Sequence, residues 1–326
     1  MIHHVIAIAF AYVLDRIIGD PLNWPHPVRW MGSLISRLDK WLNRGKYKRL
    51  NGVFMVLILL IIVGLIVGLL VWGCYQIHPI VGIAVEGIII ATTIAQKSLK
   101  DAALVVDAAL EKHDMIDARE KLQYIVGRDT AALDESEIVR ATVETVAENT
   151  TDGITAPLFW AWIGGAPLAM MYRAINTCDS MVGYRNETYE AFGWASARLD
   201  DVVNWIPARL TGFVSMFAGR PKYGNRKTAW AVLRRDAKKH NSPNSGWGEA
   251  AAAAMLGIQL GGINYYQGKQ SIAPTMGDQH QVLTRLHIGQ VIIWMKKTIY
   301  LFILLLMIGG LLYEAATTWC QSGLCL

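Results

Sequence analysis

Three carboxylates recur at helical spacing in VETVAENTTDG, residues 143–153. Glu144, Glu148 and Asp152 fall at i, i+4 and i+8, so a helix would place them along one face. Like charges at this spacing repel one another unless a cation or an arginine lies among them. Magnesium, which proteins bind through one or two carboxylates together with substrate phosphates, fits this geometry. The alternative is a solvated acidic face beside Arg140.

A second concentration of polar residues follows directly on an apolar run. In YRAINTCDSMVGYRN, residues 172–186, one helical face would carry Arg173, Asn176 and Asp179, and a turn at Gly183 would lead to Tyr184, Arg185 and Asn186. In ARLDDVVNWIPARLT, residues 197–211, the corresponding set is Arg198, Asp201 and Asn204, with Arg209 further on. Ionisable residues beside a membrane span usually face a cavity or a partner. We expect a polar, anion-accepting pocket, with structural ion pairs between helices as the alternative.

Two further motifs carry weaker signals. The proline-rich DRIIGDPLNWPHPVRWMG, residues 15–32, offers Asp20, His26 and Arg29, and a histidine at a helix boundary is more often structural than catalytic. In HNSPNSGWGEAAAAAMLGIQLGG, residues 240–262, we expect Asn244 or Ser245 to cap an alanine-rich helix with Glu249 in its first turn. Free N–H groups there could receive a phosphate, although an ordinary capped helix is the default interpretation.

Several standard site motifs are missing from the sequence. It contains no GxxxxGK[ST] or GxGxxG loop, no HExxH and no GxSxG. Its four cysteines, Cys74, Cys178, Cys320 and Cys325, show no zinc spacing. A bridge between the last two could form if the end of the chain lies outside the cytoplasm.

The elements that position these residues are membrane helices. Hydrophobic residues make up 53% of the 326-residue chain and charged residues 17%. Residues 53–74 are free of charge and long enough to span a bilayer, and residues 299–313 form a second apolar run. Weaker candidate spans cover 79–95, 154–172 and 203–218. We therefore predict an all-α, polytopic membrane protein with about four to five membrane-embedded helices in a single domain, 1–326.

The charge distribution predicts the orientation. The net charge is +5, and basic clusters at 44–49 and 220–239 mark cytoplasmic ends of spans. We expect cytoplasmic helices over 96–152, the last ending at Gly153, and a basic cytoplasmic segment over 219–249. No nucleic-acid motif accompanies these clusters, so we do not expect a nucleic-acid partner. No alternating strand pattern or repeated half is found.

A topological conflict arises at residues 154–172. If this run crosses the bilayer fully, residues 172–186 face outward, where no ATP is present. The GGAP sequence at 164–167 favours a broken or re-entrant helix, which would keep the polar residues on the cytoplasmic side.

Taken together and in order, these motifs resemble the integral-membrane adenosylcobinamide-phosphate synthase family of cobalamin biosynthesis. The resemblance runs from about residue 15 to 268 and includes GRDT at 127–130, FGWASARLDDVVNWIPARLT at 192–211 and the motifs quoted above. It implies a ligase that joins adenosylcobyric acid to an aminopropanol phosphate or ethanolamine phosphate, driven by ATP and magnesium in the cell membrane. Membrane lipid, a second copy of the chain and other late enzymes of the pathway are the implied partners.

The implied chemistry assigns roles to the polar residues. Phosphates need cations, which Arg128, Arg173, Arg185, Arg198 and Arg209 could supply. Magnesium and proton transfer need carboxylates, supplied by Glu144, Glu148 and Asp152 or by Asp179 with Asp200 and Asp201; the predicted metal ligands are Glu144, Glu148 and Asp179. Ligand binding is expected to include Asp129. Trp194 and nearby tryptophans could line a cavity for the corrinoid substrate, or form an interfacial belt.

Two other functions fit a membrane chain of this kind. A non-enzymatic regulator of the AmpE type would share the scaffold but lose the polar motifs, which are intact here. A transporter with a broken-helix site would show repeated halves. The sequence favours the ligase.

Overall fold

The computed structural model describes residues 1–21, 24–184 and 186–321. The chain forms two compact units from interleaved segments. Unit 1 comprises Met1–Ala95, Gly153–Asn204 and Ile303–Leu326, and unit 2 comprises Gln96–Asp152 and Trp205–Phe302. The predicted segment 96–152 therefore coincides with one continuous part of unit 2.

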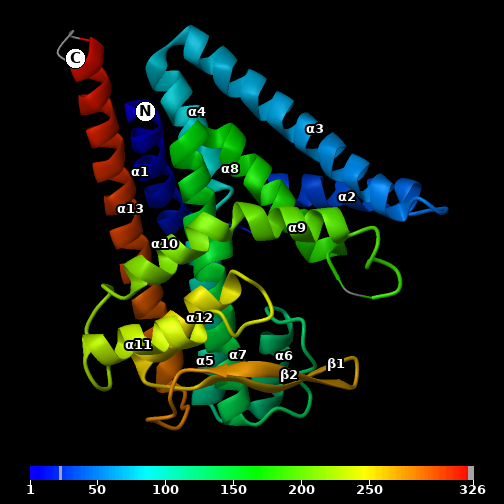
Figure 1. The fold of residues 1–326 in the computed structure, drawn as a ribbon, viewed down its shortest axis with the longest axis vertical. Helices are drawn as coiled ribbons and strands as arrows, with labels where there is room; N and C mark the ends of the chain where they lie inside the picture. Colours follow the sequence, from blue (N-terminus) through cyan, green and yellow to red (C-terminus); the bar gives the residue numbers. More distant parts are fainter. Residues whose placement is uncertain (22–23, 185, 322–326) are drawn as a thin grey trace. The chain divides into compact units, whose positions relative to one another are not determined.

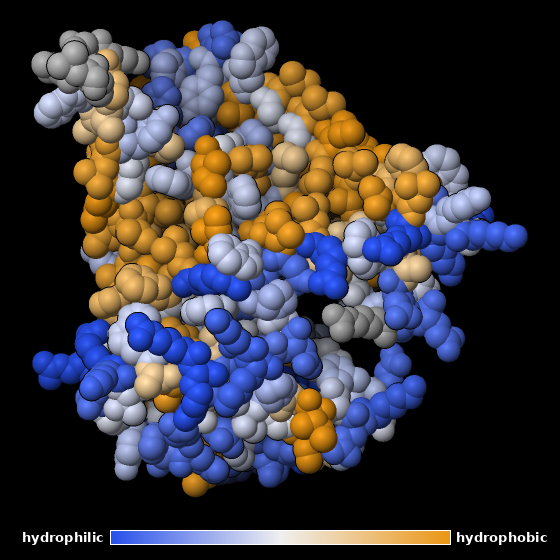
Figure 2. Space-filling view, viewed as in Figure 1, coloured by the Kyte–Doolittle hydropathy of each residue, from blue (hydrophilic) through white to orange (hydrophobic). Residues whose placement is uncertain are grey.

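Unit 1 is built from long helices (Figure 1). They are α1 (Ile2–Ile17), α2 (Pro27–Leu42), α3 (Lys48–Ile77), α4 (Pro79–Ala91), α8 (Ala156–Val182), α9 (Trp194–Val203) and the second part of α13 (Leu286–Gln321). α1 packs against α4 and α8, and α3 packs against α2, α4, α8 and α9. Figure 2 shows hydrophobic side chains along the exposed side of α3, where Leu65, Ile66 and Leu69 are 58–63% exposed. A surface this apolar is stable only when lipid covers it.

Four helical stretches of the described chain are long and apolar enough to cross a membrane: Lys48–Ile77, Pro79–Glu111, Glu135–Val182 and Leu286–Cys320. The predicted spans at 53–74, 79–95, 154–172 and 299–313 fall within them. The fifth candidate, 203–218, does not, because it corresponds to the shorter helix α10 (Trp205–Ser215). The prediction of a helical polytopic membrane protein is confirmed.

The break predicted at GGAP lies inside α8. Gly164 leaves helical geometry and Gly165 has φ 65° and ψ −158°, a conformation that essentially only glycine adopts. The carboxylate of Glu86 on α4 stabilises the break by accepting a hydrogen bond from the Ala166 N–H at 3.1 Å. Glu86 is fully buried, and it also accepts from the Tyr75 hydroxyl at 2.5 Å and lies 2.8 Å from His4 Nδ1. A polar network therefore holds the two halves of α8 in place.

Unit 2 packs around a single buried helix. Its elements are α5 (Gln96–Glu111), α6 (Met115–Gln123), α7 (Glu135–Thr150), α10, α11 (Arg226–Asp236), α12 (Ser245–Leu256), β1 (Leu260–Tyr266), β2 (Lys269–Met276) and the first part of α13. α12 contacts α7, α10, α11 and both strands. Its alanines are buried, and a Cβ on Gly248 would lie 2.7 Å from the Ala147 carbonyl oxygen, so α12 and α7 approach closely.

Two local predictions are wrong. The helix expected to stop at Gly153 instead continues through a π-helical turn, Thr151–Thr155, into α8. Strands β1 and β2 form an antiparallel hairpin where none was expected. Most of the hairpin's residues are exposed or half-buried, so no alternating apolar pattern marks it in the sequence. Positive φ at Gln267 and Gly268 permits its tight turn.

Candidate functional site

In unit 1 the end of α8 and helix α9 bring together an aspartate cluster, Asp179, Asp200 and Asp201. Asp200 accepts hydrogen bonds from the Asn204 amide at 3.0 Å and the Asn176 amide at 3.4 Å. Burial, with a smaller contribution from the charge of Asp179, raises the pKa of Asp200 to about 7. Asp179 and Asp200 form no ion pair with a basic side chain among the described residues, whereas Asp201 pairs with Arg198.

The surrounding residues fix the cluster's geometry. Asn204 is fully buried, and its amide oxygen accepts from the Tyr172 hydroxyl at 2.8 Å while its N–H donors face Asp200. The guanidinium of Arg173 donates to Asn176 at 3.3 Å. These contacts link α8 to α9 through polar side chains. Such links are expected for a polar pocket and also for structural ion pairs between the helices, so they do not distinguish the two interpretations of the sequence.

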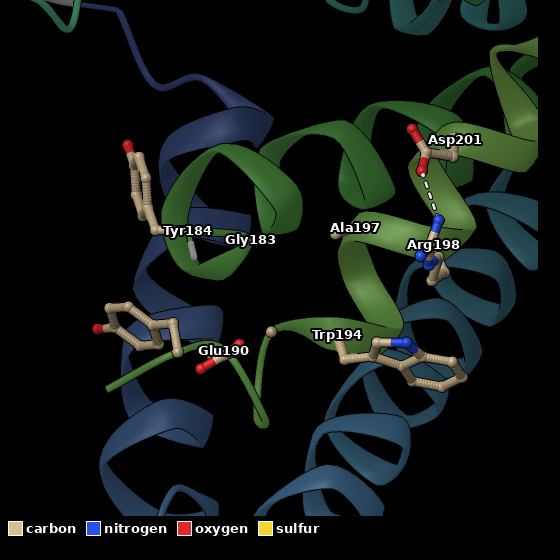
Figure 3. Close-up of a pocket in the computed structure, with 9 residues that line it drawn as sticks. Gly183, Tyr184, Glu190, Trp194, Ala197, Arg198 and Asp201 are labelled. Atoms are coloured by element: carbon tan, nitrogen blue, oxygen red, sulfur yellow. Dashed lines mark ion pairs between the residues drawn. The ribbon is translucent and has the colours of Figure 1, made fainter. Parts of the chain in front are cut away.

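A cavity of about 300 Å³ opens beside the cluster (Figure 3). Its lining includes the predicted residues Tyr184, Arg198 and Asp201, and Arg198 pairs with Asp201 at 3.5 Å. The sequence analysis missed Tyr189 and Glu190, which lie in the loop before α9, where no periodicity pointed to them. The remaining lining residues are Gly183, Gly193, Trp194 and Ala197.

The loop that carries this lining is held by backbone contacts. Asn186 accepts hydrogen bonds from the N–H groups of Thr188 and Tyr189, at 3.1 and 3.0 Å, so it shapes a turn. A Cβ on Gly193 would collide with the Val182 carbonyl oxygen. Arg185, predicted to bind ligand, lies outside the described residues.

In unit 2 a second group, the Glu144 cluster, pairs carboxylate with arginine. Arg128 donates to Glu144 at 2.5 Å and to Asn264 at 2.7 Å. Arg140 lies 3.3 Å from the same carboxylate, and the Gly261 N–H donates to it at 2.8 Å. Glu144 is only 5% exposed. The alternative of a solvated acidic face is therefore wrong for this residue.

The other carboxylates near Glu144 come from two helices. The Ser245 hydroxyl of α12 donates to Glu148 on α7 at 2.9 Å. Glu249, one turn into α12, is buried 3.6 Å from His240. Burial, followed by the charges of Glu148 and Glu144, raises the pKa of Glu249 well above its usual value. Asp152 lies half-buried in the π-helical turn, where wider bonding departs from the 3.6-residue spacing used to predict it.

The capping prediction for α12 is correct in position but not in detail. Asn244 is the N-cap residue, yet its side chain caps no helical N–H. Ser242, which the sequence analysis passed over, accepts from the backbone N–H groups of Asn244 and Ser245 at 3.2 and 3.3 Å. Asn244 instead accepts from Arg209 at 3.3 Å. The guanidinium of Arg209 stacks over the Trp205 ring at 4.2 Å, and burial lowers its pKa.

Asp129, His26 and Asp20, which were predicted to bind ligand, make structural contacts. Asp129 accepts from the N–H groups of Gln267 and Gly268, at 3.1 and 2.7 Å, and so holds the hairpin turn. His26 caps α2 through its Nδ1 and lies 3.0 Å from Asp20, as the structural interpretation of this histidine expected. Arg29 lies exposed in the first turn of α2.

The predicted metal ligands differ in how well they suit magnesium. Within the described parts of the chain, no group of three or more His, Cys, Asp or Glu side chains is arranged to hold a metal ion. Magnesium needs only one or two protein carboxylates when substrate phosphates complete its shell. Glu144 is already neutralised by two arginines, whereas Glu148 and Asp179 have no basic partner among the described residues. These two, one in each unit, keep the donor chemistry that the ion requires.

Helices long and apolar enough to cross a membrane, together with buried carboxylates and arginines, define the chain as a polytopic membrane protein with polar side chains in its interior. Residues 8–295 match the CobD/Cbib protein family. A cobalamin biosynthesis protein CobD from Halalkalibacterium halodurans is 50% identical over 312 residues, covering 95% of this chain and 98% of that protein. A cobalamin biosynthesis protein CbiB from Salmonella typhimurium is 45% identical over 314 residues, covering 92% and 96%. The chain therefore belongs to the CobD/CbiB family, which supports a role in cobalamin biosynthesis. No solved structure matches it.

Proposed function

We propose that the protein is a ligase that joins adenosylcobyric acid to (R)-1-aminopropan-2-ol O-phosphate, or to ethanolamine phosphate, through a new amide bond. Family membership and the motif resemblance support the pathway and the substrate class. The observation that carries the proposed chemistry is the aspartate cluster of unit 1, in which Asp179 and Asp200 have no basic partner in the described chain, beside a cavity with Arg198 and Tyr184 on its wall.

The proposed reaction needs two activations. The corrinoid carboxylate takes the γ-phosphoryl group of ATP and releases ADP, and the amine then attacks the acyl carbon and displaces inorganic phosphate. The amine arrives as an ammonium ion and must lose a proton before it attacks. Asp200 would hold this ammonium group and accept its proton, while Arg198 would orient the phosphate. Magnesium, held with ATP by Glu148 or Asp179, would supply charge neutralisation of the phosphates.

We propose further that this chemistry occurs on the cytoplasmic side of the cell membrane, where ATP is available. Basic residues cluster at 44–49, where α3 begins, and again in the segment 220–239. This distribution supports a cytoplasmic position for both segments. The broken helix α8 offers a way for the chain after it to remain on that side.

The test uses the full-length protein in detergent with adenosylcobyric acid, an amino-alcohol phosphate, Mg²⁺ and ATP, followed by mass spectrometry. We expect an ATP-dependent amide product that is lost in Asp179→Asn and Glu148→Gln. Asp117→Asn is the matched control, because Asp117 lies half-exposed on α6 and forms an ion pair only with Lys121 among the described residues. Corrinoid binding without product would contradict the ligase and favour a regulator, and equal loss in all three variants would contradict the assigned site.

A further inference from the structure

A second cavity, of about 390 Å³, lies within unit 2 and contains none of the residues assigned above. We call it the basic pocket. The α10–α11 connection, the end of α12 and the first part of α13 form its walls. Its lining consists of Ala218, Gly219, Arg220, Pro221, Lys222, Met255, Leu256, Gln290, Ile293, Trp294 and Lys297.

The charged side chains that line the basic pocket are all positive. Arg220, Lys222 and Lys297 are exposed, and no Asp or Glu lines the cavity. None of the three forms an ion pair with any described residue. Gly219 leaves room for the ammonium group of Lys297, which lies 4.0 Å from the position a Cβ would take. Unpaired cations around one cavity provide a site for an anion, most directly a phosphate.

A buried hydrogen-bond donor of α13 points to the same conclusion. Gln290 and Trp294 stand at i and i+4, on one face of the helix, and both line the pocket. The Trp294 side chain is 4% exposed, yet its indole N–H has no acceptor within the described chain, and Gln290 Oε1 has no donor. A buried donor without an acceptor costs about 1–3 kcal/mol. A ligand oxygen in the pocket would remove this cost.

The remaining lining suits an acyl chain or glycerol backbone. Met255 and Leu256 are buried, and Ile293 is 54% exposed. Shortly after Lys297, α13 enters the charge-free run 299–313 of a helix long enough to cross a bilayer. Lysine and tryptophan at this point of a span lie at the level of lipid headgroups.

We propose that the basic pocket binds the phosphate of an anionic phospholipid, with Arg220, Lys222 and Lys297 around the phosphate and the Trp294 N–H donating to one of its oxygens. A free phosphate, including that of an amino-alcohol phosphate, shares this chemistry but would gain nothing from the apolar wall or from the adjoining membrane span. This site is separate from the proposed ligase site and does not depend on it.

The experiment is a native mass spectrometry titration of the delipidated, full-length protein in detergent. Increasing 1-palmitoyl-2-oleoyl phosphatidylglycerol is added in one series and the corresponding phosphatidylcholine in another. We expect preferential retention of phosphatidylglycerol and a roughly fivefold weaker retention in Lys297→Gln and in Arg220→Gln, since each cation near an anionic headgroup contributes about this factor. Trp294→Phe keeps the ring but removes the donor, and should also weaken retention.

Lys296→Gln is the matched control. Lys296 is the neighbouring exposed lysine on α13 and does not line the cavity, so its variant should retain phosphatidylglycerol like the unmodified protein. Equally weakened retention of phosphatidylglycerol in Lys296→Gln and Lys297→Gln would show that the lipid is held by general electrostatic attraction to the basic surface and not by the pocket, and it would overturn the proposal. Equal retention of both lipids would do the same. Displacement of the lipid by inorganic phosphate at the same concentration would assign the pocket to free phosphate instead.

Discussion

Arg140→Gln should destabilise unit 2 far more than the loss of an exposed ion pair. Arg140 is 8% exposed and its side chain donates to the carbonyl oxygens of Gly261 and Ile263 at 2.7 and 2.9 Å, as well as to Asn264 and Glu144. Glutamine is too short and has too few donors to replace these bonds. Removing one partner of a buried ion pair costs about 3–5 kcal/mol.

The lower end of that range applies here. Arg128 and the Gly261 N–H remain on the Glu144 carboxylate after the substitution, so its charge is not left bare. In a unit of this size, 1 kcal/mol shifts the midpoint of thermal unfolding by roughly 2–4 °C. A loss of about 3 kcal/mol therefore predicts a decrease in Tm of roughly 6–12 °C.

Differential scanning fluorimetry of the purified protein in a single detergent would measure this shift. The control is Lys121→Gln, which removes another pair at i, i+4 spacing in the same unit. The Lys121 and Asp117 side chains are 36% and 43% exposed, and a solvent-accessible pair of this kind contributes no more than about 0.5 kcal/mol. A decrease for Arg140→Gln no larger than that for Lys121→Gln would show that the Glu144 cluster does not hold α7 and the hairpin together.

Three other predictions follow. Burial alone would raise the pKa of Asp236, but hydrogen bonds from Arg235 and Lys239 and from a backbone N–H hold that pKa well below its usual range. The resulting stability is present above the unfolded pKa of about 4 and is lost as the pH falls towards the folded value, so Asp236→Asn should flatten the decline in Tm between pH 5 and 3. Gly165→Ala should reduce expression and Tm more than Gly164→Ala, because the first places a methyl group against a buried carboxylate and the second against a movable leucine side chain; equal effects would refute the strained break. In a background without native cysteines, Asn186→Cys should react with an impermeant maleimide only after the inner face is exposed, whereas labelling in intact cells would place this loop outside.

The membrane helices could be predicted from sequence because their signal is local. A charge-free run such as 53–74 needs no partner to be recognised, and α3 spans it from Lys48 to Ile77. The break in α8 was also readable, since two glycines and a proline remove both the side-chain constraint and the hydrogen bond that continue a helix. Its stabilising partner, Glu86, could not be predicted in this way, because Glu86 and Ala166 are 80 residues apart in the sequence and meet only in the folded chain.

The polar site was only partly predictable for the same reason. Helical spacing correctly placed Glu144 and Arg140 on one face, but the second arginine, Arg128, and Asn264 reach that carboxylate through tertiary contacts. The hairpin was missed because side chains distant in the sequence contact its backbone, among them Asp129 at its turn. A strand held in this way carries no periodicity of its own.

Whether a carboxylate already has a basic partner affects its ability to bind a cation or accept a proton. A carboxylate that two arginines already neutralise has little free-energy gain from binding a cation, since the ion would have to displace them. Glu144 is in that position, which favours a role in holding Arg128 and Arg140 at the surface of the hairpin. Asp179 and Asp200 are in the opposite position, because neither forms an ion pair among the described residues and the charge of Asp179 opposes the ionisation of Asp200. Spacing alone treated these residues as equivalent, whereas their partners differ: Glu144 lies between two arginines, and Asp179 and Asp200 have no basic partner among the described residues.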